Sequence, residues 1–574
     1  MQLGLGNSLV TSNNINKYPK EDLQVIVYNQ PYEEEGTTYL RTSIGTGIPK
    51  VSGIGLDTIW DFSVLEDARF DKGSYVGNAY GLPEYYDYPY VNIYYDDTSE
   101  ATRYHWKLTD FTYYKLQVQM IRDTLDEVFF MNYDGTKLFI YESQLTGNNL
   151  SKILNHCSIF YYGILINEND SDPDRERVGR MEYHVSLPVQ EEIKGCLQNA
   201  DGSVNYYLDE NDWSKKADGT ASDLTGADGN VMDEVGEYYR KTDFTGNGHY
   251  FKLISWHYYS DFQKINKFYV GAYKAALNRT GTIKMWSVVN DTAEYRGGNN
   301  DDTLDGTDAT QLGKPATRTS LIDFRSYARN IVSEEYKWNV ITWKHSMLLY
   351  ELFFIEFATL NSQKAVVADL TAEGYKQGGL GNGTTTVNST DWSNFNSYYP
   401  LVPCGSSNNL GNNSGETDYT INNFGGAGVD EVVKVNRYRG VENPFGDIWE
   451  LCDGASVNHG AATSDFYTCE TPANFDDGTE SNYTKRSELP TSNGYLQYAH
   501  HDNYGIITPK VAAGNSATYF CDYFYTPGLN SGWRAVLRGG LAHNSSTAGF
   551  AYLYSNISAS TTYAYFGARL CYIP

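Results

Sequence analysis

Cysteine is scarce in this sequence of 574 residues, and no two cysteines lie close together. The seven cysteines are scattered and odd in number, and no Cys-x-x-Cys motif occurs. Zinc sites and thiol redox motifs usually place two cysteines within a few residues of each other. We therefore expect reduced, buried cysteines in a protein made in a cytoplasm. Five of them lie in the last third of the chain, so one disulfide bond there is an open alternative; they are Cys404, Cys452, Cys469, Cys521 and Cys571.

Positive charge is also scarce. The chain has 44 Lys and Arg against 71 Asp and Glu, a net charge of −27, and no basic cluster. Such a chain repels nucleic acid and anionic membranes, so neither is an expected partner. Met1–Val10 lacks the basic and apolar regions of a signal peptide. The most apolar stretch, Met347–Leu360, contains two glutamates and is too short to span a bilayer, so no membrane insertion is expected.

Familiar catalytic motifs are missing as well. The sequence has no GxxxxGK[ST], GxSxG or HExxH, and no GxGxxG that opens a helix. His500, His501 and Asp502 form its only dense ligand cluster, but adjacent side chains on a strand point to opposite faces, so His500 and His501 would rarely bind one metal. Glu351 and Glu356 could be catalytic acids, although acids on so apolar a helix more often pair with arginine. We predict no metal, no cofactor and no enzymatic activity. A glycan hydrolase with an unlocated carboxylate pair is the open alternative.

Three regions can be distinguished by composition. Residues 1–166 contain short β-rich runs at Leu23–Tyr28, Tyr90–Tyr95 and Lys137–Tyr141 and are predicted to form an N-terminal β-rich domain. Residues 167–180 are strongly charged and are predicted to be a linker.

Residues 181–574 form the third region, in which strands, turns and one strong helix are expected. The helix is predicted from Asn339 or Trp343 to Asn361, because apolar residues recur at helical spacing. Ser406–Gly428 is poor in apolar residues and is predicted to be a long loop. The fold class predicted for the whole chain is α+β and β-rich, with one long buried helix.

Three landmarks lie in the last quarter of the chain, in residues 437–574. They are Glu442–Glu450 (ENPFGDIWE), Trp533–Gly540 (WRAVLRGG) and Tyr565–Leu570 (YFGARL). Gly446, Gly539 and Gly540 allow tight backbone turns beside apolar runs. Arg538 and Arg569 need carboxylates or other acceptors if they are buried, and such partners would tie the two ends of this block together. The alternative is that both arginines reach solvent.

Together the landmarks resemble the C-type-lectin-like fold of formylglycine-generating-enzyme-like domains and of the variable proteins of diversity-generating retroelements, such as phage tropism determinants. In that family a Gly-x-Val/Ile-Trp-Glu segment, an Arg-Gly-Gly segment and a terminal Gly-Phe-Arg-like strand recur in this order. Here the last is Gly567-Ala568-Arg569, a slight departure. Segments upstream look similar to phage relatives, so the resemblance covers residues 181–574. The enzymatic branch uses cysteines near its Arg-Gly-Gly segment, and none lies between Cys521 and Cys571. The resemblance therefore implies binding, with Gly446, Trp449, Arg538, Gly539, Gly540 and Arg569 as structural residues.

The ligand is expected at Leu541–Tyr565, which is rich in Asn, Ser, Thr and Tyr and has no charged residue. Tyrosine supplies rigid contact area, and Ser and Asn supply adaptable hydrogen bonds. In the variable proteins this segment carries the ligand-facing positions, and the alternative is a hairpin whose tyrosines pack on neighbouring subunits. The resemblance implies ligand contacts from ten residues: Trp533, His543, Asn544, Ser545, Tyr552, Tyr554, Asn556, Ser558, Tyr563 and Tyr565.

The family resemblance implies a fibre or appendage protein on the surface of a bacterial virus particle, made in the cytoplasm of the host bacterium. Residues 1–166 would attach to other capsid or tail proteins, and residues 181–574 would bind a host-surface glycan or protein, or an environmental ligand. Such proteins work as symmetric homo-oligomers, of which a trimer is the first expectation and a dimer the second. A purely structural decoration protein of the capsid or tail is a further alternative.

Overall fold

The structure is a computed structural model. It describes residues 161–574 except 247, 260, 334–335, 478–480 and 503, and within residues 1–160 it describes only short strands. The chain forms two compact units. The first comprises Met1–Tyr161, Gly179–Tyr183 and His257–Ser260. The second comprises Tyr162–Val178, His184–Trp256 and Asp261–Pro574.

In the first unit the described strands pair antiparallel, two by two. The pairs are β1 (Leu23–Ile26) with β4 (Ser43–Thr46), β2 (Tyr32–Glu34) with β3 (Thr37–Tyr39), β5 (Lys50–Ser52) with β6 (Ile59–Asp61), β7 (Val91–Ile93) with β8 (Arg103–His105), and β9 (Met120–Arg122) with β10 (Glu127–Phe129). Two of the three runs expected to be strands contain β1 and β7, and Lys137–Tyr141 lies outside the described residues.

The second unit is built on a mixed sheet of 13 strands. Its main path is β14 (Val204–Tyr207), β13 (Lys194–Gln198), β15 (Asn230–Val235), β19 (Phe268–Lys274), β37 (Phe566–Tyr572), β28 (Trp449–His459), β35 (Gly532–Gly539), β36 (Gly549–Ile557), β34 (Tyr523–Tyr525) and β31 (Gly494–Tyr495). Off this path are β22 (Trp338–Val340), β29 (Ser464–Thr468) and β30 (Thr484–Leu489). The C-terminal strand β37 lies between β19 and β28, so the last residues of the chain join the two halves of the sheet.

Smaller sheets surround this one. A five-stranded sheet has the order β12 (Glu176–Gly179), β11 (Tyr162–Asn167), β17 (His249–Ser255), β16 (Tyr238–Gly246) and β18 (Gln263–Ile265). Two-stranded sheets are β20 (Ala276–Asn278) with β21 (Lys284–Trp286), β23 (Val366–Val367) with β24 (Gln377–Gly378), and β32 (Tyr498–His501) with β33 (Ile507–Val511). Residues expected to form the charged linker contribute to the second unit: Arg177 donates hydrogen bonds to the backbone oxygens of Glu356 and Lys376. The expected domain boundaries stay a prediction.

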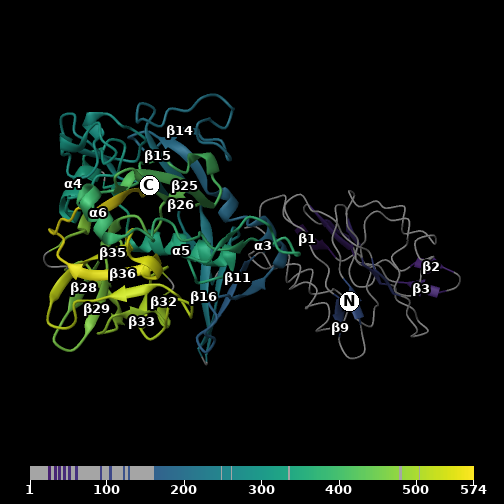
Figure 1. The fold of residues 1–574 in the computed structure, drawn as a ribbon. Helices are drawn as coiled ribbons and strands as arrows, with labels where there is room; N and C mark the ends of the chain where they lie inside the picture. Colours follow the sequence, from purple (N-terminus) through teal and green to yellow (C-terminus); the bar gives the residue numbers. More distant parts are fainter. Residues whose placement is uncertain are drawn as a thin grey trace. The chain divides into compact units, whose positions relative to one another are not determined.

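The helix α5 (Trp343–Phe357) is buried among these strands (Figure 1). The Thr342 side chain caps it by accepting the backbone N–H of His345, and Ala358 ends it in the left-handed conformation. A helix that is apolar on nearly all sides is stable only when enclosed, and α5 contacts β28 and β36. Among the described residues, no helix has the length and apolar character needed to cross a membrane.

The predicted fold class, α+β, is wrong. The structure is β-rich, with 39% of the described residues in strands and 14% helical. Apart from α5, the described α-helices are short: α3 (Met181–Ser186), α4 (Leu321–Arg329) and α6 (Ser389–Asn396). The prediction relied too heavily on the strong helical periodicity of α5. Elsewhere in the described residues, short strands alternate with Gly- and Asn-rich turns.

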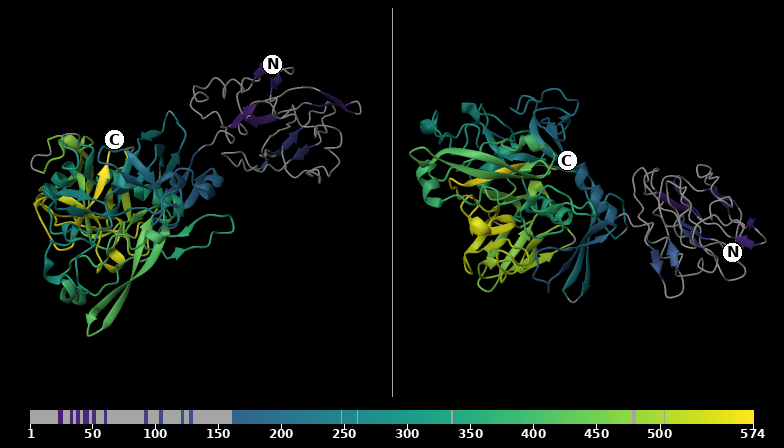
Figure 2. Two further views of the ribbon diagram at one scale, coloured as in Figure 1. Left: turned by 90° about the horizontal axis from the view of Figure 1, so that it is seen from above. Right: turned by 45° about the vertical axis from the view of Figure 1, so that its right-hand side comes forward.

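The predicted loop Ser406–Gly428 is also wrong in its second half. Residues of β25 (Gly415–Gly426) pair antiparallel with β26 (Val429–Tyr438), which in turn pairs with β27 (Val441–Glu442). This hairpin extends beyond its neighbours (Figure 2), and its tip is exposed. The strand escaped detection because most of its side chains face water, so Thr, Asn and Asp are tolerated where a buried strand would be apolar.

The prediction of buried, unpaired cysteines is confirmed for the described part of the chain. Six cysteines there are free and buried: Cys196, Cys404, Cys452, Cys469, Cys521 and Cys571. Cys157 lies outside the described residues.

Candidate functional site

Glu450 on β28 is the centre of a buried charge cluster that holds the C-terminal strands together. Its carboxylate pairs with Arg538 of β35, with Arg569 of β37 at 2.8 Å and with Lys274 of β19 at 3.2 Å. Burial by itself would raise the pKa of Glu450, but these three cations outweigh it and hold that pKa well below its usual value. Both arginines are fully buried, and neither reaches solvent.

The landmark glycines lie where a side chain would not fit. Gly446 has a φ of 81°, and a Cβ there would lie 2.6 Å from Cγ2 of Thr385. Gly539 and Gly540 also have positive φ angles, 89° and 80°. The backbone therefore turns sharply before β28 and at the end of β35, as the sequence predicts for these positions. The turn after Gly540 leads into the segment expected to contact ligand.

Trp449, next to Glu450, connects this framework to a group of aromatic rings. Its ring lies 4.7 Å from the ring of Tyr552 and 5.0 Å from that of Tyr554, both on β36. Tyr552 and Trp449 are buried, whereas Tyr554 is half-buried. Because side chains alternate along a strand, Tyr554 and Asn556 in the second half of β36 are half-buried while Ser555 and Ile557 face inward.

Tyrosines from several segments extend this group and form a second one near it. Tyr525 of β34 stacks on Tyr554 at 5.0 Å with the rings 13° apart, and Tyr563 stacks on Tyr565 at 5.4 Å and 8°. Further ring contacts add three members: Tyr523 on Tyr552 (5.5 Å), Tyr495 on Tyr523 (5.1 Å) and Tyr398 on Tyr565 (6.1 Å). We call the half-buried or exposed members the tyrosine surface: Tyr398, Tyr495, Tyr523, Tyr525, Tyr554, Tyr563 and Tyr565.

The structure brings only some of the ten predicted ligand residues to this surface. Tyr554, Tyr563 and Tyr565 belong to it, Tyr552 lies beneath it, and Asn556 follows Tyr554 on β36. His543 is at its margin, 6.2 Å from the ring of Tyr398.

The other four predicted residues make different contacts. Trp533 packs on Tyr467 of β29 at 5.0 Å. Asn544 accepts the backbone N–H of Leu541, and Ser558 bonds to neighbouring hydroxyls. Ser545 is exposed with a φ of 50°. Asn544 and Ser558 thus take part in local turns, so their polar side chains already have partners within the chain.

Four members of the surface were missed by sequence reasoning: Tyr398, Tyr495, Tyr523 and Tyr525. They lie outside the segment that the family resemblance singles out; Tyr495, Tyr523 and Tyr525 reach the surface through strand pairing, and Tyr398 reaches it from the turn after α6. One local signal existed. Tyr523 and Tyr525 alternate with Phe524, as expected for a strand with one buried and one accessible face.

Tyr554, Tyr565 and His543 are electrically neutral at ordinary pH. Burial, followed by the neighbouring Tyr525 and Tyr565, raises the pKa of Tyr554 to about 12. Burial and the adjacent phenols also raise the pKa of Tyr565, and burial lowers the pKa of His543, which favours its neutral ring. Neutral phenols offer both a hydrogen-bond donor and an acceptor beside an apolar ring, a combination suited to contact with a polar, uncharged ligand surface.

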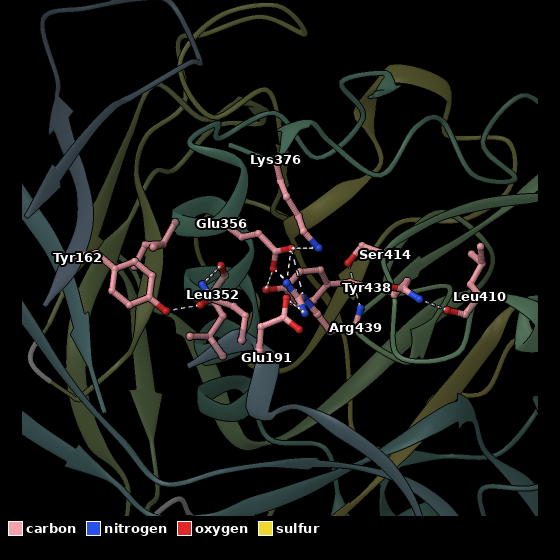
Figure 3. Close-up of polar contacts among 12 residues, drawn as sticks. Tyr162, Glu191, Leu352, Glu356, Lys376, Leu410, Ser414, Tyr438 and Arg439 are labelled. Atoms are coloured by element: carbon pink, nitrogen blue, oxygen red, sulfur yellow. Dashed lines mark hydrogen bonds and ion pairs between the residues drawn. The ribbon is translucent and has the colours of Figure 1, made fainter. Parts of the chain in front are cut away.

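The two acids of α5 are bound by cations. Glu351 pairs with Arg240 at 2.8 Å and Lys252 at 2.7 Å. The carboxylate of Glu356 accepts hydrogen bonds from two guanidinium nitrogens of Arg439, and its Oε1 lies 3.7 Å from Nζ of Lys376 (Figure 3). Although burial raises the pKa of Glu351, the two cations lower it to about 2. These carboxylates have the arrangement of structural ion pairs.

His500 and His501 point to different surroundings. His500 contacts the backbone oxygen of Glu488 at 3.2 Å, whereas the buried His501 packs on the rings of Tyr250 and Phe520. Within the described residues, no group of three or more His, Cys, Asp or Glu side chains is placed to hold a metal ion.

No protein-family model matches the chain, and no curated protein matches it.

Proposed function

We propose that this protein is a surface component of a bacterial virus particle and that it binds a host-surface or environmental ligand through the tyrosine surface. The observation that carries the binding proposal is the clustering of seven accessible tyrosines from separate segments. Tyr495, Tyr523, Tyr525 and Tyr554 lie in ring contact with one another or with the buried pair Trp449 and Tyr552. Tyr398, Tyr563 and Tyr565 form a second group in ring contact, and Tyr565 lies near enough to Tyr554 to raise the pKa of Tyr554. Accessible aromatic patches of this kind typically mark interaction sites.

The framework under the surface supports the same proposal. The ion pairs of Glu450 fix β28, β35 and β37, and Trp449 packs against both tyrosines of β36. A rigid support lowers the entropic cost of binding, since less of the site must be ordered by the ligand. The viral setting is supported by the resemblance of the three C-terminal landmarks to the lectin-like variable proteins.

In this proposal residues 1–166 attach the protein to other capsid or tail proteins, and the protein is a homo-oligomer, with a trimer preferred over a dimer. Several copies would then present several tyrosine surfaces, so weak single contacts would combine. Light scattering of the purified chain tests this part: a trimeric mass is the expected result, and a monomer at micromolar concentration contradicts it.

The binding proposal is tested with the labelled full chain on a panel of bacterial cells and of purified cell-surface glycans. Saturable binding to some members, with no change in glycan chain length after incubation, is the expected result. Shortened chains would favour the glycan hydrolase. Absence of binding across the panel, together with incorporation of the protein into particles, would favour a structural decoration protein.

A further inference from the structure

The turn that follows α6 has an unusual backbone. Ser397 and Tyr398 have φ angles of 59° and 70°, both in the left-handed region. In the part of the chain that the structure describes, they are the only two neighbouring non-glycine residues with positive φ. A left-handed residue commonly ends a helix, which accounts for Ser397. It does not account for Tyr398, because a bulky side chain in this conformation costs free energy that glycine would avoid.

Two buried side chains of α6 hold this turn in place. The indole N–H of Trp392 donates to the backbone oxygen of Tyr399 at 2.8 Å. The side-chain amide of Asn396 donates to the same oxygen at 3.0 Å and to the backbone oxygen of Pro400 at 3.3 Å. Trp392 is fully buried, and Asn396 is 3% exposed. Strained backbone persists only where the surrounding contacts enforce it, and these three hydrogen bonds fix the chain directly after the strained residues.

The strained turn determines where the ring of Tyr398 lies. The ring is half-buried, with its centre 5.5 Å from that of Trp392 and 6.1 Å from that of Tyr565 in the tyrosine surface. The ring of His543 lies 6.2 Å away. Tyr398 therefore connects the buried end of α6 to the second tyrosine group while part of its ring stays accessible.

We propose that Asn396 is a positioning residue for ligand binding: together with Trp392 it keeps the turn after α6 in its strained conformation, so that Tyr398 is in place before a ligand arrives. This inference rests on the proposed function, because the ligand is the one that the tyrosine surface binds. A contact residue that is fixed in advance loses less conformational entropy on binding. Strained backbone that is enforced by buried neighbours is typical of such preorganised sites.

The positioning is measured first, without any ligand. A fluorinated tyrosine is incorporated at position 398 alone in the full chain, and fluorine NMR spectra are recorded for the wild type and for Asn396→Ala. The variant should show shifted or additional resonances, because the turn loses two of its three hydrogen bonds and populates other conformations. Identical spectra would overturn the proposal.

Binding is measured next, on the bacterial cells of the panel that retain the most wild-type protein. The affinity of Asn396→Ala should fall by about tenfold, because apparent affinity falls in proportion to the population of the binding-competent conformation. Asn388→Ala is the matched control at the other end of α6. It removes the cap that accepts the backbone N–H groups of Thr390 and Asp391, so it weakens the helix but leaves the turn intact. The control should keep the wild-type spectrum and affinity.

A second variant keeps the test decisive if Asn396→Ala does not fold. Tyr398→Gly removes the ring, and glycine adopts the left-handed conformation without strain. Its unfolding temperature should stay within a few degrees of the wild type while its affinity for the cells falls. A large drop in unfolding temperature would assign Tyr398 a structural role instead.

The outcomes separate this inference from the proposed function. If the wild type binds no cell or glycan of the panel, the proposed function fails, whatever the spectra show. If the wild type binds and Asn396→Ala binds equally well, this inference alone fails. Equal losses of affinity in Asn396→Ala and Asn388→Ala would also contradict it, because they would show that only the stability of α6 matters.

Discussion

Glu450 and Arg569 are 119 residues apart in the chain, yet Nε of Arg569 lies 2.8 Å from Oε2 of Glu450 with both side chains fully buried. Arg569 also donates to the backbone oxygens of Gly271, Ala272 and Glu442. A buried ion pair contributes little net stability compared with an apolar pair, but removing one partner leaves an uncompensated charge. Removing either Glu450 or Arg569 alone should therefore destabilise the C-terminal strand, because the remaining buried charge would have lost its partner.

Replacing Glu450 with Gln should lower the free energy of unfolding by about 3–5 kcal/mol, because Arg538, Arg569 and Lys274 would lose their shared carboxylate. Urea unfolding followed by tryptophan fluorescence measures this. Lys434→Gln is the control, since it breaks the exposed pair with Asp418 and should cost less than about 1 kcal/mol. Equal, small losses in both variants would show that the cluster is not structural.

Tyr552 and Tyr563 should differ sharply when each is replaced by Ala. Tyr552 is buried against Trp449, so its loss should cost about 3–5 kcal/mol of stability. Tyr563 is 44% exposed, so its loss should change stability by less than about 0.5 kcal/mol. Thermal and urea unfolding of both variants, with Tyr552→Phe as a conservative control, make the comparison. A large stability loss in Tyr563→Ala would contradict its assignment to an accessible surface.

Asp522 makes stability depend on pH. Burial raises its pKa to about 8, although a hydrogen bond from the backbone N–H of Ala551 opposes this. The folded state therefore keeps a proton that the unfolded state releases near pH 4. Stability should fall as pH rises from about 4 to about 8, by up to about 1.4 kcal/mol per unit from this group.

The variant Asp522→Asn should remove this part of the pH dependence. Asparagine can still accept from Ala551 and hydrogen-bond with Ser362, which now lies 3.2 Å from the carboxyl. Unfolding free energies at pH 5 and pH 8 are compared for both proteins. Relative to the wild type, the variant should have a higher free energy of unfolding at pH 8 than at pH 5. If the unfolding free energies of the two proteins change with pH in parallel, the assignment to Asp522 is wrong.

Gly446 offers a test of the turn before β28. Its φ of 81° and the short approach of Thr385 make any side chain unfavourable there. Gly446→Ala should destabilise the protein by more than about 1 kcal/mol, as measured by urea unfolding. Gly219 also has a positive φ, but a Cβ there would meet nothing within 4 Å, so Gly219→Ala separates backbone strain from the clash. Equal losses in the two variants would rule out the clash.

Local signals in the sequence predicted part of this structure. The spacing of apolar residues placed α5, and the landmark glycines coincide with sharp turns. Buried arginines require acceptors, and Arg538 and Arg569 share Glu450. These features depend on neighbours in sequence or on a rule about burial that holds in any fold.

Features that depend on distant pairing were not predictable in this way. The polar strand β25 is recognisable only beside β26, and the α+β class was wrong because short strands give weak patterns. Tyr398 and Tyr495 join the tyrosine surface through contacts with residues about 170 and 30 positions away, respectively, and no local pattern encodes such contacts.

The most direct test of the central claim is ligand binding by a variant that alters the tyrosine surface without altering the fold. The double variant Tyr525→Ala/Tyr563→Ala removes one ring from each stacked pair, and Tyr504→Ala removes a tyrosine that is 50% exposed outside the tyrosine surface. Binding of each labelled protein to the cells or glycan that retain the wild type is measured at saturation. The account predicts at least a tenfold loss for the double variant, corresponding to the more than about 1 kcal/mol typical of central aromatic contacts, and no loss for Tyr504→Ala. Full binding by a folded double variant would contradict it.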